Sequence, residues 1–346
     1  MKTLELERKT YTAVLDELQT EKAIALVKSH FVERLSSKLN LFKVEAPLLV
    51  QQGTGINDDL NGIENPVSVN VKEMPKVAVE IVHSLAKWKR AKLARLKTPI
   101  NTGLVTDMKA LRPDEDISDV HSIYVDQWDW EIVIAEEERT ITKLKNTVQK
   151  IYKSILDTEE FITSVYPELT AFLPQEITFI HSEELQQKYP DLSPKERERE
   201  ICKLKGAVFI IGIGGELADG KKHDGRAPDY DDWSTPTSPK TKGLNGDILL
   251  WNKVLGNSFE ISSMGIRVNS QALYMQLFLS SEEQRLNLEW HQKLLKGELP
   301  FTIGGGIGQS RLAMLLLQKK HIGEVQSSIW PEELTTVLKK QNINLL

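Results

Sequence analysis

A glycine-rich run near residue 305 combines residue types that can bind an anion. Four glycines fall within five positions of the run Thr302–Leu312, which reads TIGGGIGQSRL. Because glycine lets the backbone approach a ligand or a neighbouring strand closely, the run is either a binding loop or tight packing between a strand and a helix. The apolar residues after it predict a buried helix with Arg311 in its first turn. A loop opening this helix would present free N–H groups, and Arg311 a planar charge, to a phosphate or carboxylate.

Two polar side chains alternate with two tryptophans in a second run. Residues Ser122–Trp130 predict a strand, so Gln127 and Asp129 share one face while Trp128 and Trp130 lie on the other. An amide and a carboxylate on a strand held by two tryptophans suit recognition of an ammonium or α-amino group. The alternative is a polar strand face turned to solvent.

Two acidic residues are placed to meet across a predicted hairpin. Residues 247–252 and 258–263 predict strands, and Gly256-Asn257 predicts the turn between them. Asp247 and Glu260 can then approach each other. Two carboxylates beside phosphates are a common way of holding Mg²⁺.

The composition excludes several functional classes. The chain has 346 residues, 27% of them charged, with a net charge of −5, which argues against a general electrostatic surface for nucleic acid. It contains no apolar stretch of about 18 residues, so no membrane-spanning helix is expected. The one cysteine, Cys202, excludes an internal disulfide and a cysteine metal cluster. The N-terminal residues lack the apolar core of a signal peptide, so the expected compartment is the cytosol.

The predicted helices and strands that position these residues do not follow a regular strand–helix alternation. Residues 20–40 predict an amphipathic helix, and the extended run 42–50 contains Pro47, which favours an edge or interface strand. This pair is either a dimer contact or packing on the chain's own core. Residues 215–246 predict a long loop, and loops of this length are usually functional. Hairpins and meanders between helices predict an α+β fold with an antiparallel sheet.

A basic cluster follows the strand predicted at 77–82. Ser84 can cap the next helix, which contains Lys87, Lys89 and Arg90. Such a cluster is usually a solvated helix face, although one member can reach an anion near the strand end.

Several longer runs carry a family resemblance. Pro47 after an amphipathic helix, Arg112 before a strand, and Gly304-x-Gly306-x-Gly308-x-x-Arg311 resemble, in order, the three motifs of class II aminoacyl-tRNA synthetases. With the glycine run, four more specific runs resemble ammonia-dependent aspartate–ammonia ligase, which is built on the class II synthetase core: His83–Arg90, Met108–Asp116, Tyr124–Glu131 and Arg226–Trp233. The resemblance extends from about residue 20 to the C-terminus. The first twenty residues and the segment 235–242 carry no matching motif.

The resemblance implies a fold and a reaction. Residues 1–346 would form a single class II synthetase-like catalytic domain, an antiparallel β-sheet flanked by helices, with 215–246 as a long active-site loop and with a homodimer as the assembly. Aspartate's side-chain carboxylate would attack the α-phosphate of ATP, giving β-aspartyl-AMP and pyrophosphate, and ammonia would then displace AMP to give asparagine. Free ammonium is expected because Cys202 lies in no nucleophile-elbow pattern. The alternatives are an aspartyl-tRNA synthetase relative and an inactive synthetase-like regulator.

The resemblance also implies which residues hold the nucleotide. Arg112 would hold the α-phosphate, and Arg311 would contact the adenine and the phosphates. Asp247 and Glu260 would place Mg²⁺. The other candidate ATP contacts are His121, Ser122, Asp231, Gly306 and Gly308, of which Asp231 is the weaker candidate because loop acids are often only solvated.

Aspartate and ammonium would be held by residues of four other segments. Gln127 and Asp129 would bind the α-amino group. Asp58 would orient the ammonium and take a proton, since a carboxylate attracts NH₄⁺ and can act as a general base; without the resemblance, Asp58 is typical of a turn. The carboxylates of aspartate would be bound by Ser84, Lys89 and Arg267, with Ser262 and Ser263 nearby.

Overall fold

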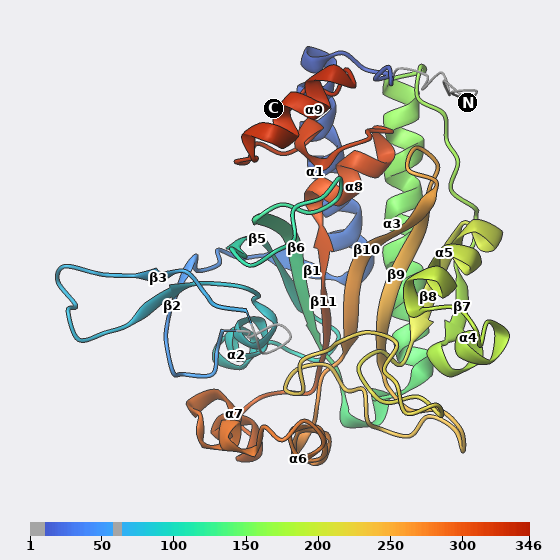
Figure 1. The fold of residues 1–346 in the computed structure, drawn as a ribbon. Helices are drawn as coiled ribbons and strands as arrows, with labels where there is room; N and C mark the ends of the chain where they lie inside the picture. Colours follow the sequence, from blue (N-terminus) through green and yellow to red (C-terminus); the bar gives the residue numbers. More distant parts are fainter. Residues whose placement is uncertain (1–10, 58–63) are drawn as a thin grey trace, which may run out of the picture.

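A long sheet supplies the frame on which the predicted site residues are placed. The computed structural model describes residues 11–57 and 64–346. Within these residues, eight strands form one sheet in the order β1-β5-β6-β11-β10-β9-β8-β7 (Figure 1). Their bounds, in that order, are Leu41–Lys43, Gly103–Leu111, Tyr124–Val133, Thr302–Gly308, Asn257–Ile266, Asn245–Asn252, Ala207–Ile211 and Thr178–His181.

The pairing of the strands confirms the predicted α+β class. The five strand pairs from β5 to β8 are antiparallel, whereas the outermost pairs, β1 with β5 and β7 with β8, are parallel. The sheet is therefore mixed, with the expected antiparallel core and parallel pairing at both edges.

A smaller sheet lies beside the large one. It has the order β2-β4-β3, with bounds Leu49–Gln51, Val79–Ile81 and Ser68–Val69 (Figure 1). The prediction of one extended run over 42–50 was wrong, because β1 and β2 belong to different sheets and Pro47 lies between them. Proline has no N–H to contribute to a strand ladder, so the break falls at this residue.

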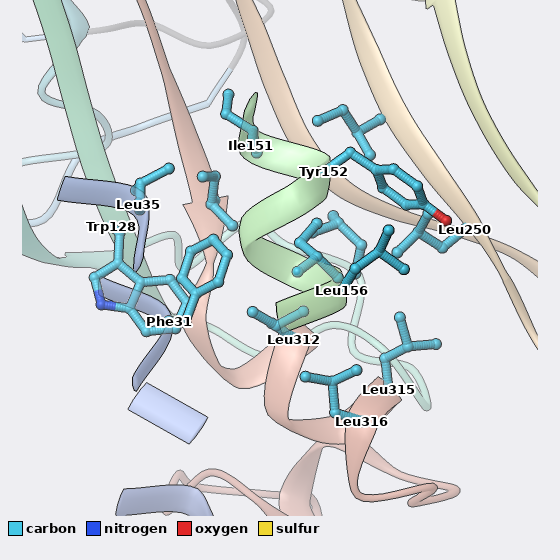
Figure 2. Packing of buried hydrophobic residues seen from close by; sticks show 14 of the residues in the cluster. Phe31, Leu35, Trp128, Ile151, Tyr152, Leu156, Leu250, Leu312, Leu315 and Leu316 are labelled. Carbon is cyan, nitrogen blue, oxygen red and sulfur yellow. The ribbon is translucent and has the colours of Figure 1, made fainter. Parts of the chain in front are cut away.

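Three helices cover one face of the large sheet. They are α1 (Glu17–Leu39), α3 (Ile141–Val165) and α8 (Gln309–Leu316), and their buried side chains join one hydrophobic core with the sheet. In Figure 2, Phe31 of α1 packs against Trp128, with ring centroids 4.6 Å apart, while Tyr152 of α3 lies near Leu250. Because Trp128 and Trp130 face this core, strand alternation directs Gln127 and Asp129 to the opposite face, as predicted.

Of the remaining helices, α2 packs against β6 and β11, α5 packs against β9 and β10, and α6 and α7 lie together at one end of the molecule (Figure 1). The pattern Ser193-Pro194-x-Glu196 predicts a capped helix start, and Asn269 is a predicted cap of the helix that runs through 280. Both are confirmed, because Ser193 caps α5 with Pro194 at its first position and Asn269 caps α6. The sequence predicts one helix over about 282–296, whereas the structure has a 3₁₀ turn followed by α7 there. The bounds are α2 Ala86–Leu96, α4 Ser182–Lys188, α5 Pro194–Lys205, α6 Ser270–Leu279, α7 Glu289–Leu295 and α9 Glu332–Lys340, with 3₁₀ turns at Glu136–Glu138, Glu283–Asn287 and Ile322–Glu324. In the part of the chain that the structure describes, every helix is too short or too polar to cross a membrane.

The glycine-rich run is a strand, so of the two alternatives the loop was wrong and close packing with neighbouring elements is confirmed. Residues Thr302–Gly308 form β11 in the middle of the sheet, between β6 and β10. Helix α8 starts directly after it at Gln309, and Arg311 lies in the first turn as expected. Glycine disfavours strands on its own, so neighbouring side chains must explain this one.

The basic cluster on α2 is buried, which contradicts the expectation of a solvated face. Lys87, Lys89 and Arg90 are 3%, 1% and 1% exposed. Each has a polar partner, since Arg90 donates to two backbone carbonyls and the two lysines pair with aspartates. Ser84 lies one residue before the helix N-cap, and its Oγ accepts the N–H of Ala86 at 3.1 Å.

Candidate active site

One cleft collects the predicted site residues. Its volume is about 910 Å³, and it lies over strands β6, β10 and β11. Every predicted site residue in the described part of the chain lines it: Ser84, Lys89, Arg112, His121, Ser122, Gln127, Asp129, Asp231, Asp247, Glu260, Ser262, Ser263, Arg267, Gly306, Gly308 and Arg311. The remaining one, Asp58, lies outside the described residues. The structure therefore brings the residues together, and the ligand of each stays a prediction.

Alternate glycines of β11 make room for the side chains of the cleft. A Cβ at Gly304 would overlap Glu131 Oε2, and a Cβ at Gly306 would overlap Gln127 Oε1 and lie 2.9 Å from Asp129 Oδ1. A Cβ at Gly308 would lie 3.2 Å from Cβ of Arg311. The run is thus a strand that omits its side chains so that polar groups of β6 and α8 can lie across it.

A buried lysine–aspartate pair forms one end of the cleft. Lys89 Nζ lies 2.9 Å from Asp129 Oδ2 and donates to the carbonyl of Gly305 at 2.9 Å. Burial lowers the pKa of Lys89 from its ordinary value, against the raising effect of Asp129 and Glu131. The second oxygen, Asp129 Oδ1, is buried and has no hydrogen-bond partner among the described residues. It can therefore accept a hydrogen bond from a ligand's ammonium group.

Arg267 lies between two carboxylates in the same region. Its guanidinium pairs with Glu131 at 2.7 Å and also with Asp231, and all three side chains are buried. Burial would raise the pKa of Glu131, but the charge and hydrogen bonds of Arg267 hold that pKa below its ordinary value. Asp231, expected as a weak candidate, is therefore a buried partner of Arg267 rather than a solvated loop acid.

Asp247 and Glu260 come together on neighbouring strands, as predicted from the hairpin. Burial and the nearby charge of Glu260 raise the pKa of Asp247, whereas Arg311, Lys195 and Arg226 outweigh burial and lower the pKa of Glu260. Arg226 Nη2 lies 2.6 Å from Asp247 Oδ1. Two like charges drawn together in a cleft, both oxygen donors, fit a hard divalent cation shared with phosphates. Over 11–57 and 64–346, no group of three or more His, Cys, Asp or Glu side chains could hold a metal unaided.

The end of the cleft where the nucleotide is expected, termed the nucleotide end, is more open. Arg311 Nη1 donates to the carbonyl of Glu260 at 3.1 Å, and Arg112 Nη2 donates to the carbonyl of His83 at 3.1 Å. Burial, with the positive charge of Arg311, lowers the pKa of His121 to about 4. Ser122 Oγ donates to Gln326 Oε1 at 2.5 Å. A neutral imidazole beside two guanidinium groups is suited to a polyanionic ligand with an aromatic base.

A family comparison agrees with this arrangement. The family model described as aspartate–ammonia ligase matches residues 18–342. The chain belongs to the aspartate–ammonia ligase family. It is therefore a ligase, and the predicted family is confirmed.

Solved structures show the fold that this ligase shares. One is asparaginyl-tRNA synthetase from Pyrococcus horikoshii with asparaginyl-adenylate: TM-score 0.66, 16% identity, 90% of this chain and 70% of that chain covered. The Entamoeba histolytica asparaginyl-tRNA synthetase with asparaginyl-adenylate has a TM-score of 0.64 and 14% identity, covering 90% and 66%. The Entamoeba histolytica aspartyl-tRNA synthetase has a TM-score of 0.60 and 14% identity, covering 89% and 57%. The ligase thus has a class II synthetase core and spans about two-thirds or less of two of these chains.

Four further residues, three of them lining the ligase cleft and one beside it, were not predicted as site residues. The residue beside the cleft is Glu131, which pairs with Arg267 and lies two positions after Asp129, so strand alternation alone could have identified it. Arg226 lies in one of the runs that carried the resemblance, and it pairs with both Asp231, at 3.3 Å, and Asp247. Lys195 and Asp224 pair at 2.8 Å, and they come from α5 and the long loop, where no local pattern marks either.

Proposed function

We propose that this ligase makes asparagine from aspartate, ammonia and ATP, through β-aspartyl-AMP and with release of AMP and pyrophosphate. The family match supports the overall reaction. The observation that carries the route is the cleft itself, in which a buried polar set around Lys89 and Asp129 adjoins a guanidinium–carboxylate set around Arg311 and Glu260. An amino acid and a nucleotide can be held side by side there, and holding the reactants together accounts for much of such a rate enhancement.

The aspartate end supplies groups for each polar part of the substrate. We assign the α-amino group to Gln127 and Asp129, because Asp129 Oδ1 has free acceptor capacity within the described structure. We assign the carboxylates to Lys89 and Arg267, together with Ser84 and the two serines of β10, Ser262 and Ser263. In the first step, a carboxylate oxygen of aspartate forms a bond to the α-phosphorus, and the bond to pyrophosphate breaks.

The nucleotide end supplies positive charge for that step. Arg112 and Arg311 would bind the α-phosphate and the leaving pyrophosphate, because charge develops on those oxygens. The Nε of Arg112 is buried without a partner in the part of the chain that is described, so it has a hydrogen bond left to donate. Further contacts to ATP would come from His121, Ser122, Asp231, Gly306 and Gly308.

Mg²⁺ is part of this proposal. Asp247 and Glu260 would hold it, as their oxygen donors and adjoining positions fit a hard cation. When bound with ATP, the ion supplies positive charge to the phosphate oxygens.

The second step requires ammonia at the activated carboxyl group. Nitrogen attacks the acyl carbon, the C–N bond forms and the C–O bond to AMP breaks. We retain Asp58 as the residue that binds ammonium and takes its proton, on the resemblance of the sequence alone. The only cysteine, Cys202, is buried, and burial raises its thiol pKa far above the usual range, so no glutamine-cleaving thiolate is expected from it.

A product assay tests the function. The chain is incubated with aspartate, ATP, Mg²⁺ and ammonium chloride. Asparagine formed with equal AMP and pyrophosphate is the expected result. Asparagine with ADP and phosphate would overturn the adenylate route, and turnover with glutamine equal to that with ammonium would overturn the nitrogen source.

The synthetase-like fold supports one alternative function. The neighbours that share the fold are described as asparaginyl- and aspartyl-tRNA synthetases. The competing function is therefore formation of an aminoacyl adenylate whose acyl group is transferred to tRNA. Charging of tRNA with aspartate, without asparagine formation, would establish it. The net charge of −5 favours the ammonia route.

We also propose a homodimer in the cytosol, with residues 1–346 acting as one catalytic unit. The first strands beside α1 expose apolar side chains: Phe42 is 37%, Leu48 50% and Leu49 42% exposed. Such side chains next to Pro47 suit a subunit contact. Light scattering at micromolar concentration should give twice the mass of 39.2 kDa; a monomer would contradict the proposal.

A further inference from the structure

Asp126 connects three separate parts of the chain behind the nucleotide end of the cleft. It lies on β6 next to Gln127 and is 6% exposed. One carboxylate oxygen, Oδ2, pairs with Lys28 Nζ of α1 at 2.8 Å. The other, Oδ1, accepts the backbone N–H of Ser310 at 3.0 Å and the side-chain amide of Gln326 at 3.4 Å. Both oxygens are thus used, one by Lys28 of α1 and the other by Ser310 and Gln326.

Helix α8 depends on this carboxylate for its N-terminal cap. The N-cap residue is Gly308, which has no side chain to accept a free N–H. Asp126 accepts one of those N–H groups from a neighbouring strand, and its negative charge is favourable at the positive end of the helix. The next residue after Ser310 is Arg311, whose side chain lies along Gly308, so the first turn of α8 sets where the guanidinium lies.

The same network reaches a second nucleotide-end residue. Gln326 donates to Asp126 and to Ser310 Oγ, at 3.1 Å, and it accepts the hydroxyl of Ser122 at 2.5 Å. Ser122 and Arg311 come from segments almost 190 positions apart, yet both are held through Asp126. None of these contacts involves the residues assigned to aspartate.

We propose that Asp126 is a positioning residue for the ATP half of the site, an inference that rests on the proposed function. It acts through Arg311 and Ser122 rather than by touching substrate. Lys28 has a supporting role, because it pairs with a carboxylate that is otherwise buried. Asp126 also lines a second cavity, of about 540 Å³, beside α1, so the carboxylate links that helix to the nucleotide end of the cleft.

The decisive measurement separates the KM values for ATP and for aspartate. Asp126→Ala removes the cap, so the KM for ATP should rise about tenfold, the lower end of the effect expected for losing one hydrogen bond to a charged group. The KM for aspartate should stay within about twofold, because Lys89 and Arg267 do not touch Asp126. Asp126→Asn keeps an acceptor oxygen for Ser310 but loses the charge, so its KM for ATP should rise by a smaller factor, about threefold.

A matched control comes from another ion pair of α1. Lys38 and Asp157 lie 2.9 Å apart on α1 and α3, away from the cleft. Asp157→Ala should leave both KM values unchanged, and its melting temperature shows how much stability such a pair contributes.

Each outcome bears on the proposal. An unchanged KM for ATP in Asp126→Ala, or an equal rise in both KM values, would overturn the positioning role. If Asp126→Ala is not recovered folded, Asp126→Asn decides in the same way. Failure of the proposed function is recognised separately, since the wild-type chain would then form no asparagine.

Discussion

The two ends of the cleft differ in how strongly their side chains are buried and ion-paired before any ligand binds. At the aspartate end, Lys89, Asp129 and Arg267 are 1–2% exposed and already ion-paired. At the nucleotide end, the side chains of Arg311, Glu260 and His121 are 24%, 35% and 38% exposed, and the ion pair between Arg311 and Glu260 is long, at 3.8 Å. The aspartate end is thus preorganised, whereas the nucleotide end still has charges facing the solvent of the cleft.

Because of this difference in burial, substitutions at the two ends should differ in how much they change the stability of the fold. A buried charge that loses its partner is strongly destabilising, whereas an exposed pair contributes little. Substitutions at the aspartate end should therefore affect folding and activity together. Substitution of the partly exposed Arg311 at the nucleotide end should affect activity with little effect on folding.

The largest effect is expected from Arg267→Ala. It leaves the buried carboxylates Glu131 and Asp231 without their shared partner, which should cost about 3–5 kcal/mol of unfolding free energy. Urea denaturation followed by fluorescence measures this. A variant as stable as the wild type would show that the aspartate end is not held together by this guanidinium.

Gly306→Ala should lower the activity with aspartate and should change the free energy of unfolding less than Arg267→Ala does. The added Cβ overlaps Gln127 Oε1 and displaces Asp129, so kcat/KM for aspartate should fall about 100-fold, as expected for a misplacement of about 1 Å. The matched variant is Gly305→Ala, whose Cβ would lie 2.6 Å from Met264 Cβ in the core. Gly305→Ala should instead lower the free energy of unfolding. Equal changes in kcat/KM for aspartate and in stability for the two variants would contradict this distinction.

Gly304 and Gly306 also show the limits of prediction from the sequence. Their clustering correctly indicated a close approach, but glycine is as typical of a loop as of a strand without side chains. The side chains that require glycine here are Gln127 and Glu131 on the adjacent strand, about 175 residues earlier in the chain. In contrast, the common face of Gln127 and Asp129 was predictable, because strand alternation is a local rule.

The lysine at the aspartate end was misjudged for a similar reason. A basic cluster on a helix is normally solvated, and nothing within α2 shows otherwise. The burial of Lys89 depends on Asp129, a partner 40 positions away on another element. Cap signals such as Ser193 with Pro194 were read correctly because all the atoms involved lie within four residues.

At the nucleotide end, Arg311→Ala should separate binding from stability. Its pair with Glu260 is 3.8 Å long and partly exposed, so the unfolding free energy should change by less than about 1 kcal/mol. The value of kcat/KM for ATP should fall about thirtyfold, the size of a hydrogen bond to a charged group. Pyrophosphate exchange into ATP measures this, and a loss of stability comparable to that of Arg267→Ala would remove the distinction between the two ends.

The smallest effect concerns pH and His121. Its pKa is lowered to about 4 in the folded chain from an ordinary value of 6.5, because burial and Arg311 disfavour the charged form. The unfolded chain therefore binds more protons between these values, so this contribution to stability is present above pH 6.5 and is lost as the pH falls toward 4. His121→Gln, which does not titrate, should show a shallower loss of stability over this window in urea midpoints measured at several pH values. Parallel curves for the variant and the wild type would mean that His121 is solvated at the open end and contributes nothing to the difference between the two ends.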